Sequence, residues 1–78
     1  MVKRNGGRGR FVVCVRNTGY PASLEVRKIY RALSDRSAER HAMLRIVDES
    51  GEDYLYPAKF FMALDLPQPL RTALRRVG

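Results

Sequence analysis

At 78 residues the chain fits one domain and no more, and a domain of this size has a thin hydrophobic core. Fifteen Lys and Arg against eight Asp and Glu give a formal net charge of +7, which attracts phosphate backbones or acidic partners. No apolar run is long enough to span a bilayer, and the basic N-terminus lacks the apolar stretch of a signal peptide. The single cysteine excludes an intrachain disulfide. We therefore expect a cytoplasmic binding protein with no membrane partner and no deep catalytic cleft.

The first ten residues, MVKRNGGRGR, combine three glycines with four cations: Lys3, Arg4, Arg8 and Arg10. Glycine loses the most backbone entropy on ordering, so residues 1–10 are predicted to form a flexible basic arm. Short Arg/Gly-rich segments of this kind contact RNA, and a solubilising tail is the alternative interpretation. Phe11–Val15 follows as a β-branched and aromatic strand, and Cys14 inside it is predicted to be buried and unreactive.

Residues 16–21 are turn formers, whereas the next segment, LEVRKIYRAL at 24–33, has two interpretations. Its apolar residues fall at helical spacing, and they also alternate with charged residues as in a strand. Periodicity alone slightly favours the helix. Farther along the chain, residues 37–41 are predicted to form one helical turn and residues 70–77 a short C-terminal helix.

The clearest local signal is a β-hairpin that joins residues 43–47 to 54–56, with Ser50-Gly51 at its tip. Counting outward from the tip opposes Asp48 to Asp53. The pairs that follow are Val47 with Tyr54, Ile46 with Leu55, and Arg45 with Tyr56. One face then holds Leu44, Ile46 and Leu55, and the other holds Arg45, Val47, Tyr54 and Tyr56. A slip of one residue exchanges the two faces and places the tyrosines in the core.

The hairpin tip is strongly acidic, with Asp48, Glu49, Glu52 and Asp53 within six positions. Like charges opposed across a hairpin cost a few tenths of a kcal/mol or more per pair. A solvated turn is the default interpretation, because exposed charge pairs contribute little. The alternative is that a cation, the basic arm or a neighbouring molecule offsets these charges. The spacing of a calcium-binding loop is absent, so no metal is expected here. After the hairpin, residues 57–59 break the strand and residues 60–64 resume it.

The phrases LEVRKIYRAL, LRIVDESGEDYLYPAKFF and ALDLP resemble a small uncharacterised bacterial protein family over roughly residues 13–66. The layout also resembles SH3-like (Src-homology-3-like) barrels, in which a long loop follows the first strand and a proline with an aromatic beyond it precedes the last strand. Here YLYPAKFF, residues 54–61, matches that final pattern. The resemblance implies that LEVRKIYRAL is extended. It also implies a five-stranded barrel over residues 11–66, followed by a short C-terminal helix and tail over residues 67–78.

The SH3-like resemblance has gaps where peptide-binding members carry their groove. Those members use a tryptophan in the groove and a tyrosine motif in the first strand. This chain has no Trp, and the corresponding segment reads CVRNTGY. Binding of PxxP peptides is therefore not expected.

The sequence favours the first of two functions and leaves the second, from a different class, as the alternative. The first is an accessory module for RNA or single-stranded nucleic acid, since bases stack on aromatic rings while cations hold phosphates. Its candidate binding residues are Arg4, Arg8, Arg10, Arg45, Tyr54 and Tyr56. The second is a protein-interaction or assembly module that docks a partner through a Tyr/Phe surface, with Tyr20 and Phe60 as candidate residues. For the tyrosines, ordinary packing in the core is the simpler interpretation.

Catalysis is not expected. The chain carries none of the phosphate-binding, zinc-protease, nucleophile-elbow or dinucleotide motifs, so no cofactor and no metal are predicted. A nucleophile pair of Cys14 with the single histidine, His41, lacks any residue to orient it. The oligomeric state is not determined by the sequence.

Overall fold

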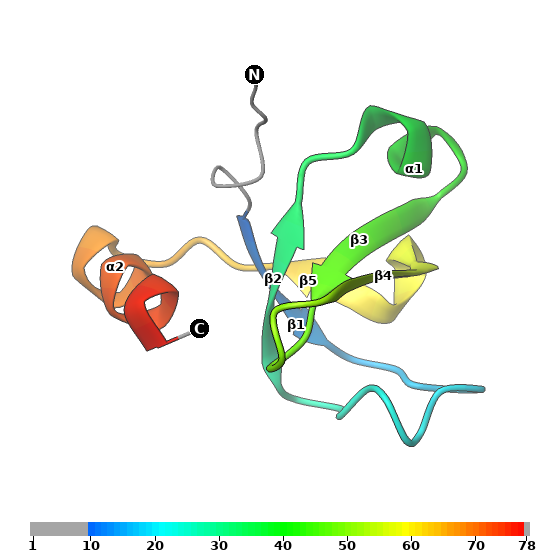
Figure 1. The fold of residues 1–78 in the computed structure, drawn as a ribbon, viewed down its shortest axis with the longest axis horizontal. Coiled ribbons are helices and arrows are strands. Elements are labelled where there is room, and N and C mark those ends of the chain that lie inside the picture. Colours follow the sequence, from blue (N-terminus) through cyan, green and yellow to red (C-terminus); the bar gives the residue numbers. More distant parts are fainter. Residues whose placement is uncertain (1–9, 78) are drawn as a thin grey trace.

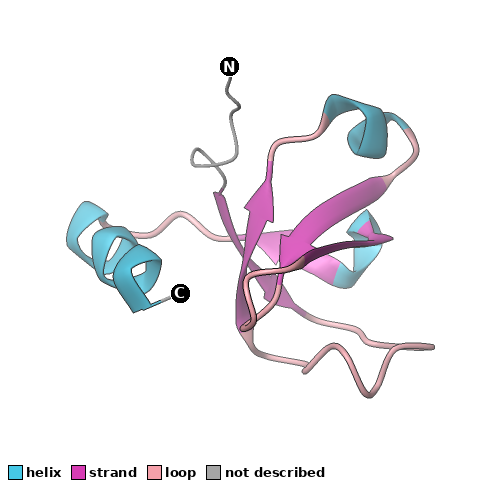
Figure 2. Ribbon diagram, in the orientation of Figure 1, coloured by secondary structure: helices cyan, strands magenta, loops and turns pink. Residues whose placement is uncertain are grey.

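Apolar residues dominate the segments that form strands, and turn-forming or helical segments separate them (Figures 1 and 2). The computed structural model describes residues 10–77, and the side chains through residue 74. Its elements are β1 (Arg10–Cys14), β2 (Ile29–Leu33), α1 (Arg36–Arg40), β3 (Met43–Val47), β4 (Asp53–Pro57), the 3-10 helix η2 (Ala58–Phe60), β5 (Phe61–Ala63) and α2 (Gln68–Val77). The protein is thus mainly β, as predicted.

The five strands form one antiparallel sheet in the order β4-β3-β2-β1-β5. Strands that follow one another in the chain lie side by side, except that β5 returns to pair with β1. The pairing does not close on itself, so β4 and β5 are the two edges of the sheet. Figure 1 shows the long β1–β2 connection below the sheet and α2 beside it, at the end of the 64–67 segment.

The hydrophobic core lies on one face of the curved sheet. Alternate residues of the central strands are buried there, as expected when one side of a strand packs inward. The core residues of the strands, of η2 and of the β1–β2 connection are Val12, Cys14, Leu24, Tyr30, Ala32, Leu44, Ile46, Tyr56, Phe60 and Phe61. Cys14 is fully buried and its Sγ donates to the Arg16 carbonyl oxygen at 3.2 Å, which confirms the predicted burial. Leu24 reaches the core from the loop and is 1% exposed.

The segment 24–33 is half turn and half strand, so the helix favoured by its periodicity is wrong. The chain turns at Val26-Arg27, and only Ile29–Leu33 joins the sheet. Arg27 has a φ of 76°, and its backbone N–H donates to the Cys14 carbonyl oxygen at 2.6 Å. A residue in the left-handed region interrupts helix and strand alike. The extended conformation implied by the SH3-like resemblance therefore holds for the second half of the segment.

The hairpin register differs by one residue from the prediction. Val47 pairs with Asp53, Ile46 with Tyr54, Arg45 with Leu55 and Leu44 with Tyr56. The reason is the loop: the Asp48 N–H donates to the Glu52 carbonyl oxygen at 2.8 Å, which leaves three residues, 49–51, between them. Gly51 supplies the positive φ, 91°, that such a three-residue loop requires. An odd loop shifts the register relative to loops of two or four, and the faces exchange.

The remaining predicted elements are confirmed at their approximate positions. α1 begins after Asp35, whose Oδ1 accepts from the Ala38 N–H at 3.0 Å as an N-cap. α2 begins at Gln68, two residues before the predicted start, because Pro69 is tolerated in the first turn of a helix. Among residues 10–77, no helix combines the length and the apolar character needed to cross a membrane.

Candidate functional site: a tyrosine-lined pocket

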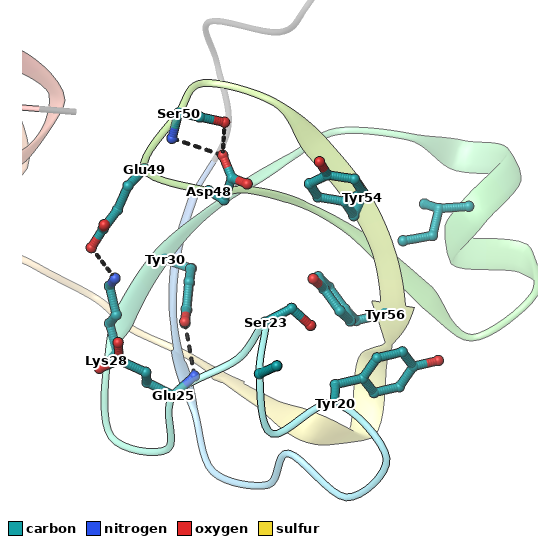
Figure 3. Close-up of a pocket in the computed structure, with 12 residues that line it drawn as sticks. Tyr20, Ser23, Glu25, Lys28, Tyr30, Asp48, Glu49, Ser50, Tyr54 and Tyr56 are labelled. Atoms are coloured by element: carbon teal, nitrogen blue, oxygen red, sulfur yellow. Dashed lines mark hydrogen bonds and ion pairs between the residues drawn. The ribbon is translucent and has the colours of Figure 1, made fainter.

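All four tyrosines of the chain line one hollow, which we call the tyrosine pocket (Figure 3). Its volume is about 780 Å³, within the range of about 300–1,000 Å³ that ligand pockets usually have. The lining residues are Tyr20, Ala22, Ser23, Glu25, Lys28, Tyr30, Asp48, Glu49, Ser50, Tyr54, Leu55 and Tyr56. They come from the β1–β2 connection, the start of β2, the hairpin loop and β4.

The observed register of the hairpin is what brings the tyrosines of β4 into the pocket. Tyr54 and Tyr56 stand two residues apart and share the face of Leu44 and Ile46, their pairing partners. Tyr56 lies deep, 6% exposed, whereas Tyr54 near the end of the strand is 45% exposed. Figure 3 shows Tyr54 and Tyr56 on one wall and Tyr30 on the opposite wall. The pocket is therefore an extension of the core that opens to solvent at Tyr54.

Aromatic packing holds the floor of the pocket in place. The rings of Tyr20 and Tyr56 pack edge to face with their centroids 5.1 Å apart. The centroid of the Tyr20 ring also lies 6.1 Å from that of the Phe60 ring. The Tyr30 hydroxyl accepts a hydrogen bond from the Glu25 N–H at 2.9 Å, which ties the β1–β2 connection to β2. Such edge-to-face pairs contribute about 0.5–1.5 kcal/mol beyond the area they bury. The aromatic walls are thus positioned without any ligand.

The rim of the pocket is acidic, although the protein as a whole is basic. Glu25, Asp48 and Glu49 contribute three carboxylates against one ammonium from Lys28, a local net charge of −2. Asp48 Oδ1 accepts hydrogen bonds from the Ser50 hydroxyl at 2.6 Å and from the Ser50 N–H at 2.8 Å. These bonds, with the hydroxyl contributing most, lower the pKa of Asp48, so the carboxylate keeps its charge to a lower pH than a free aspartate.

Lys28 occupies one side of the pocket and contacts both kinds of group that line it. Its Nζ forms an ion pair with Glu49 Oε2 and lies 5.3 Å from the centre of the Tyr30 ring. The hydrogen bond to Glu49 is the main cause of a raised Lys28 pKa. Among the described residues, the ion pairs Lys28–Glu49 and Arg45–Asp53, the latter at 3.4 Å, offset two of the four acidic residues at the hairpin tip. Residues 1–9 of the basic arm, another expected source, lie outside the described residues.

The phenol of Tyr54 is bound to the acidic loop rather than left free. Its hydroxyl donates to Glu52 Oε1 at 2.5 Å. The carboxylate stabilises the protonated phenol and opposes the phenolate charge, so the pKa of Tyr54 rises to about 12. The exposed ring is thereby oriented at the mouth of the pocket.

Replacing Glu52 by glutamine is expected to lower the pKa of Tyr54 from about 12 toward its ordinary value of 10.0. The amide still accepts a hydrogen bond but removes the negative charge that opposes ionisation. Titration of the tyrosine ring ¹³C signals measures this pKa directly. Glu39→Gln on α1 removes a charge elsewhere and should leave the Tyr54 titration unchanged. A wild-type Tyr54 that ionises near pH 10 would contradict the orientation described here.

The structure separates the residues of the predicted nucleic-acid face. Arg45 lies on the opposite face from Tyr54 and Tyr56, where its Nε donates to Asp35 Oδ2 at 2.8 Å. The predicted face of a cation beside two tyrosines is therefore wrong, because the register differs. Arg10 is exposed at the start of β1, and Arg4 and Arg8 lie outside the described residues.

The two candidate partner-binding residues do meet. Tyr20 lines the pocket at 39% exposure, and Phe60 is a core residue, 5% exposed, in contact with its ring. Sequence reasoning missed Tyr30, Lys28, Glu25 and Glu49 as residues of the same site. Their convergence depends on the path of the β1–β2 connection, which carries no local sequence signal. The acidic tip beside a Tyr-rich strand was the one visible clue.

The opposite face of the sheet carries a smaller hollow of about 230 Å³ that α2 borders through Leu74. Phe11, Ile29 and Val47 line it, and Met62 on β5 is 61% exposed. The Arg31 Nε atom is buried and has no hydrogen-bond partner among the described residues. We call this side of the sheet the outer face.

Cys14 and His41 do not form a pair in the structure. Cys14 Sγ bonds to the Arg16 carbonyl in the core, whereas His41 is exposed after α1 with its Nδ1 2.9 Å from the Ser37 carbonyl oxygen.

Comparison of the chain with protein-family models, with curated proteins and with solved structures finds no match in any of the three.

Proposed function

We propose that the protein is an interaction module that docks a segment of a partner protein in the tyrosine pocket. The observation that carries this proposal is the convergence of all four tyrosines on one hollow of about 780 Å³. Tyrosine is enriched where proteins bind each other, because it presents a large rigid ring and a polar tip at low entropic cost. Tyr20 and Tyr54 are 39% and 45% exposed, so their rings are accessible to a docking segment.

The chemistry of the pocket supports binding rather than catalysis. Its lining residues include Ser23 and Ser50 but neither histidine nor cysteine, so no serine there has an imidazole base beside it. The Ser50 hydroxyl donates to Asp48 within the loop, a bond that shapes the hairpin tip.

We also propose that the fold is an SH3-like barrel. The strand order β4-β3-β2-β1-β5 and the 3-10 helix between the last two strands support it. So does the long β1–β2 connection, which packs Leu24 into the core and covers one end of the curved sheet. On this proposal the tyrosine pocket lies between that connection and the β3–β4 hairpin.

Nucleic-acid binding is the second candidate, and the net charge of +7 favours it. A phosphate backbone would have to bind away from the tyrosine pocket, because the three rim carboxylates repel it. Exposed arginines such as Arg10, Arg16 and Arg36 are the cations that remain for this role.

Selection from a random 12-residue peptide display library tests the proposed function. We expect the selection to yield peptides that bind the wild-type protein. The Tyr54→Ala substitution should weaken the binding of these peptides by about 2 kcal/mol, the loss typical of a central aromatic contact. Met62→Ala removes a more exposed apolar side chain from the outer face and should leave binding unchanged.

Labelled single-stranded RNA, titrated at several salt concentrations, is the parallel arm of the experiment. The second candidate would replace the proposed function if the selection yields no peptide and RNA binds. In that case the logarithm of RNA affinity should fall linearly with the logarithm of salt concentration. Peptides that bind Tyr54→Ala as tightly as wild type would also contradict the proposal.

A further inference from the structure

The sign of the charge around the tyrosine pocket specifies what it can hold, provided that the proposed function is correct. The pocket combines tyrosine rings with three carboxylates on its rim. The negative faces of aromatic rings and carboxylates both attract cations, and both repel anions. The pocket is therefore built for a positively charged group, in a protein whose remaining surface favours negative ones.

Lys28 shows how a cation sits in this pocket. Its ammonium lies over the ring of Tyr30 and pairs with Glu49, so it uses a ring face and a carboxylate together. The Lys28 side chain retains 28% of its exposure and that of Glu49 retains 81%, so solvent reaches the pair. An exposed ion pair contributes little, and a ligand can therefore displace it at small cost.

A further carboxylate lies on the same side of the pocket as Lys28 (Figure 3). The carboxylate of Glu25 makes no ion pair with any residue in the described part of the chain, and the residue is exposed. Across the opening, the ring of Tyr54 is 45% exposed and oriented by Glu52. A cation in the position of the Lys28 ammonium therefore lies over the ring of Tyr30 and near two carboxylates, those of Glu49 and Glu25. The ring of Tyr54 is accessible to the rest of a bound segment.

We propose that the tyrosine pocket takes the guanidinium of an arginine from a basic segment of a partner protein, and that Lys28 competes with it as an internal cation. Arginine fits because its planar guanidinium stacks on an aromatic face while its N–H groups donate to carboxylates. The volume of about 780 Å³ accommodates neighbouring residues of the segment as well. The overall charge of +7 does not prevent this, because salt screens distant charges beyond about 8 Å at physiological ionic strength.

Replacement of arginine by citrulline in the selected peptides tests the charge alone, because citrulline keeps the shape of the side chain. We expect the selected peptides to contain arginine, and we expect citrulline to weaken them about 5- to 30-fold, the combined effect of one cation–π contact and one ion pair. Isothermal titration calorimetry with synthetic peptides measures this ratio.

Two variants of the protein locate the effect. Glu25→Gln should weaken the arginine peptide about 2- to 5-fold, whereas Glu39→Gln, on α1, should have no effect. Lys28→Gln should tighten the same peptide about 2- to 5-fold, because it removes the competing cation.

Selected peptides without arginine, or a citrulline peptide that binds as tightly as its arginine parent, would overturn this inference. The proposed function would stand in that case, because a peptide still binds through Tyr54. A Lys28→Gln variant that binds more weakly would overturn the role of Lys28 as a competitor. If the library yields no peptide at all, the inference and the proposed function fail together.

Discussion

Replacing Tyr56 by alanine is expected to lower the free energy of unfolding by about 3–5 kcal/mol, the cost of truncating a large buried aromatic residue. Tyr56 is 6% exposed and its ring packs against Tyr20 and Phe61. A small domain is stable by about 5–15 kcal/mol, so this variant should be close to unfolded. Urea denaturation followed by circular dichroism measures the loss.

Two matched variants separate the ring of Tyr56 from its position in β4. Tyr56→Phe keeps the ring and should cost little, because no hydrogen bond from the Tyr56 hydroxyl is present among the described residues. Tyr54→Ala, two residues earlier on the same face, should change stability by less than about 0.5 kcal/mol because its side chain is exposed. If Tyr54→Ala and Tyr56→Ala lose the same free energy of unfolding, the result would contradict the burial of Tyr56 and the exposure of Tyr54.

Replacing Leu24 by alanine is expected to cost about 2–5 kcal/mol, although Leu24 lies in a loop. It is 1% exposed, and its backbone N–H donates to the Tyr20 carbonyl oxygen at 2.9 Å. Its carbonyl oxygen accepts from Asn17 Nδ2 at 3.0 Å. Loss of this side chain should therefore loosen the wall of the tyrosine pocket as well as the core.

Amide exchange and urea denaturation together test the role of Leu24. The Leu24 N–H donates to the Tyr20 carbonyl oxygen and the Glu25 N–H to the Tyr30 hydroxyl on β2, and exchange at both should accelerate in the Leu24→Ala variant. Val26→Ala is the matched control, because Val26 belongs to the same loop and is 42% exposed. If both variants lose the same stability, the β1–β2 connection does not pack on the core as described.

Local sequence signals were sufficient for most of the strands and for both helices. β1, β3 and β4 coincide closely with predicted strands, and α1 and α2 with the predicted helical segments. The LEVRKIYRAL segment fits both the helical and the strand periodicity, so its pattern does not determine its secondary structure. The turn at Arg27 depends on a tertiary hydrogen bond to Cys14, which no local pattern reveals.

The predicted nucleic-acid face is wrong because the register of the hairpin differs by one residue from the predicted register. The predicted register centres an even loop on Ser50-Gly51, whereas Gly51 ends a three-residue loop in which the Asp48 side chain accepts from Ser50. Because side chains alternate along a strand, this one-residue difference moved both tyrosines of β4 from the face of Arg45 to the core face. The observed register therefore places Tyr54 and Tyr56 in the tyrosine pocket.

The convergence of the pocket residues had no counterpart in the sequence. Tyr20, Tyr30 and Tyr54 come from the β1–β2 connection, β2 and β4, and they line one pocket only in the folded chain. The basic composition pointed to acidic partners, while the charge inside the pocket has the opposite sign. Net charge describes the whole surface, and a binding site depends on the few groups that line it.

The most direct test of the tyrosine pocket as the docking site is a map of where a selected peptide binds. Ring signals of the four tyrosines and the methyl signal of Met62 are recorded by ¹H–¹³C NMR as the peptide is added. We expect shifts at Tyr20, Tyr30 and Tyr54, which line the pocket, and none at Met62 on the outer face. Shifts at Met62 with unchanged tyrosine rings would contradict the account and place the docking site on the opposite side of the sheet.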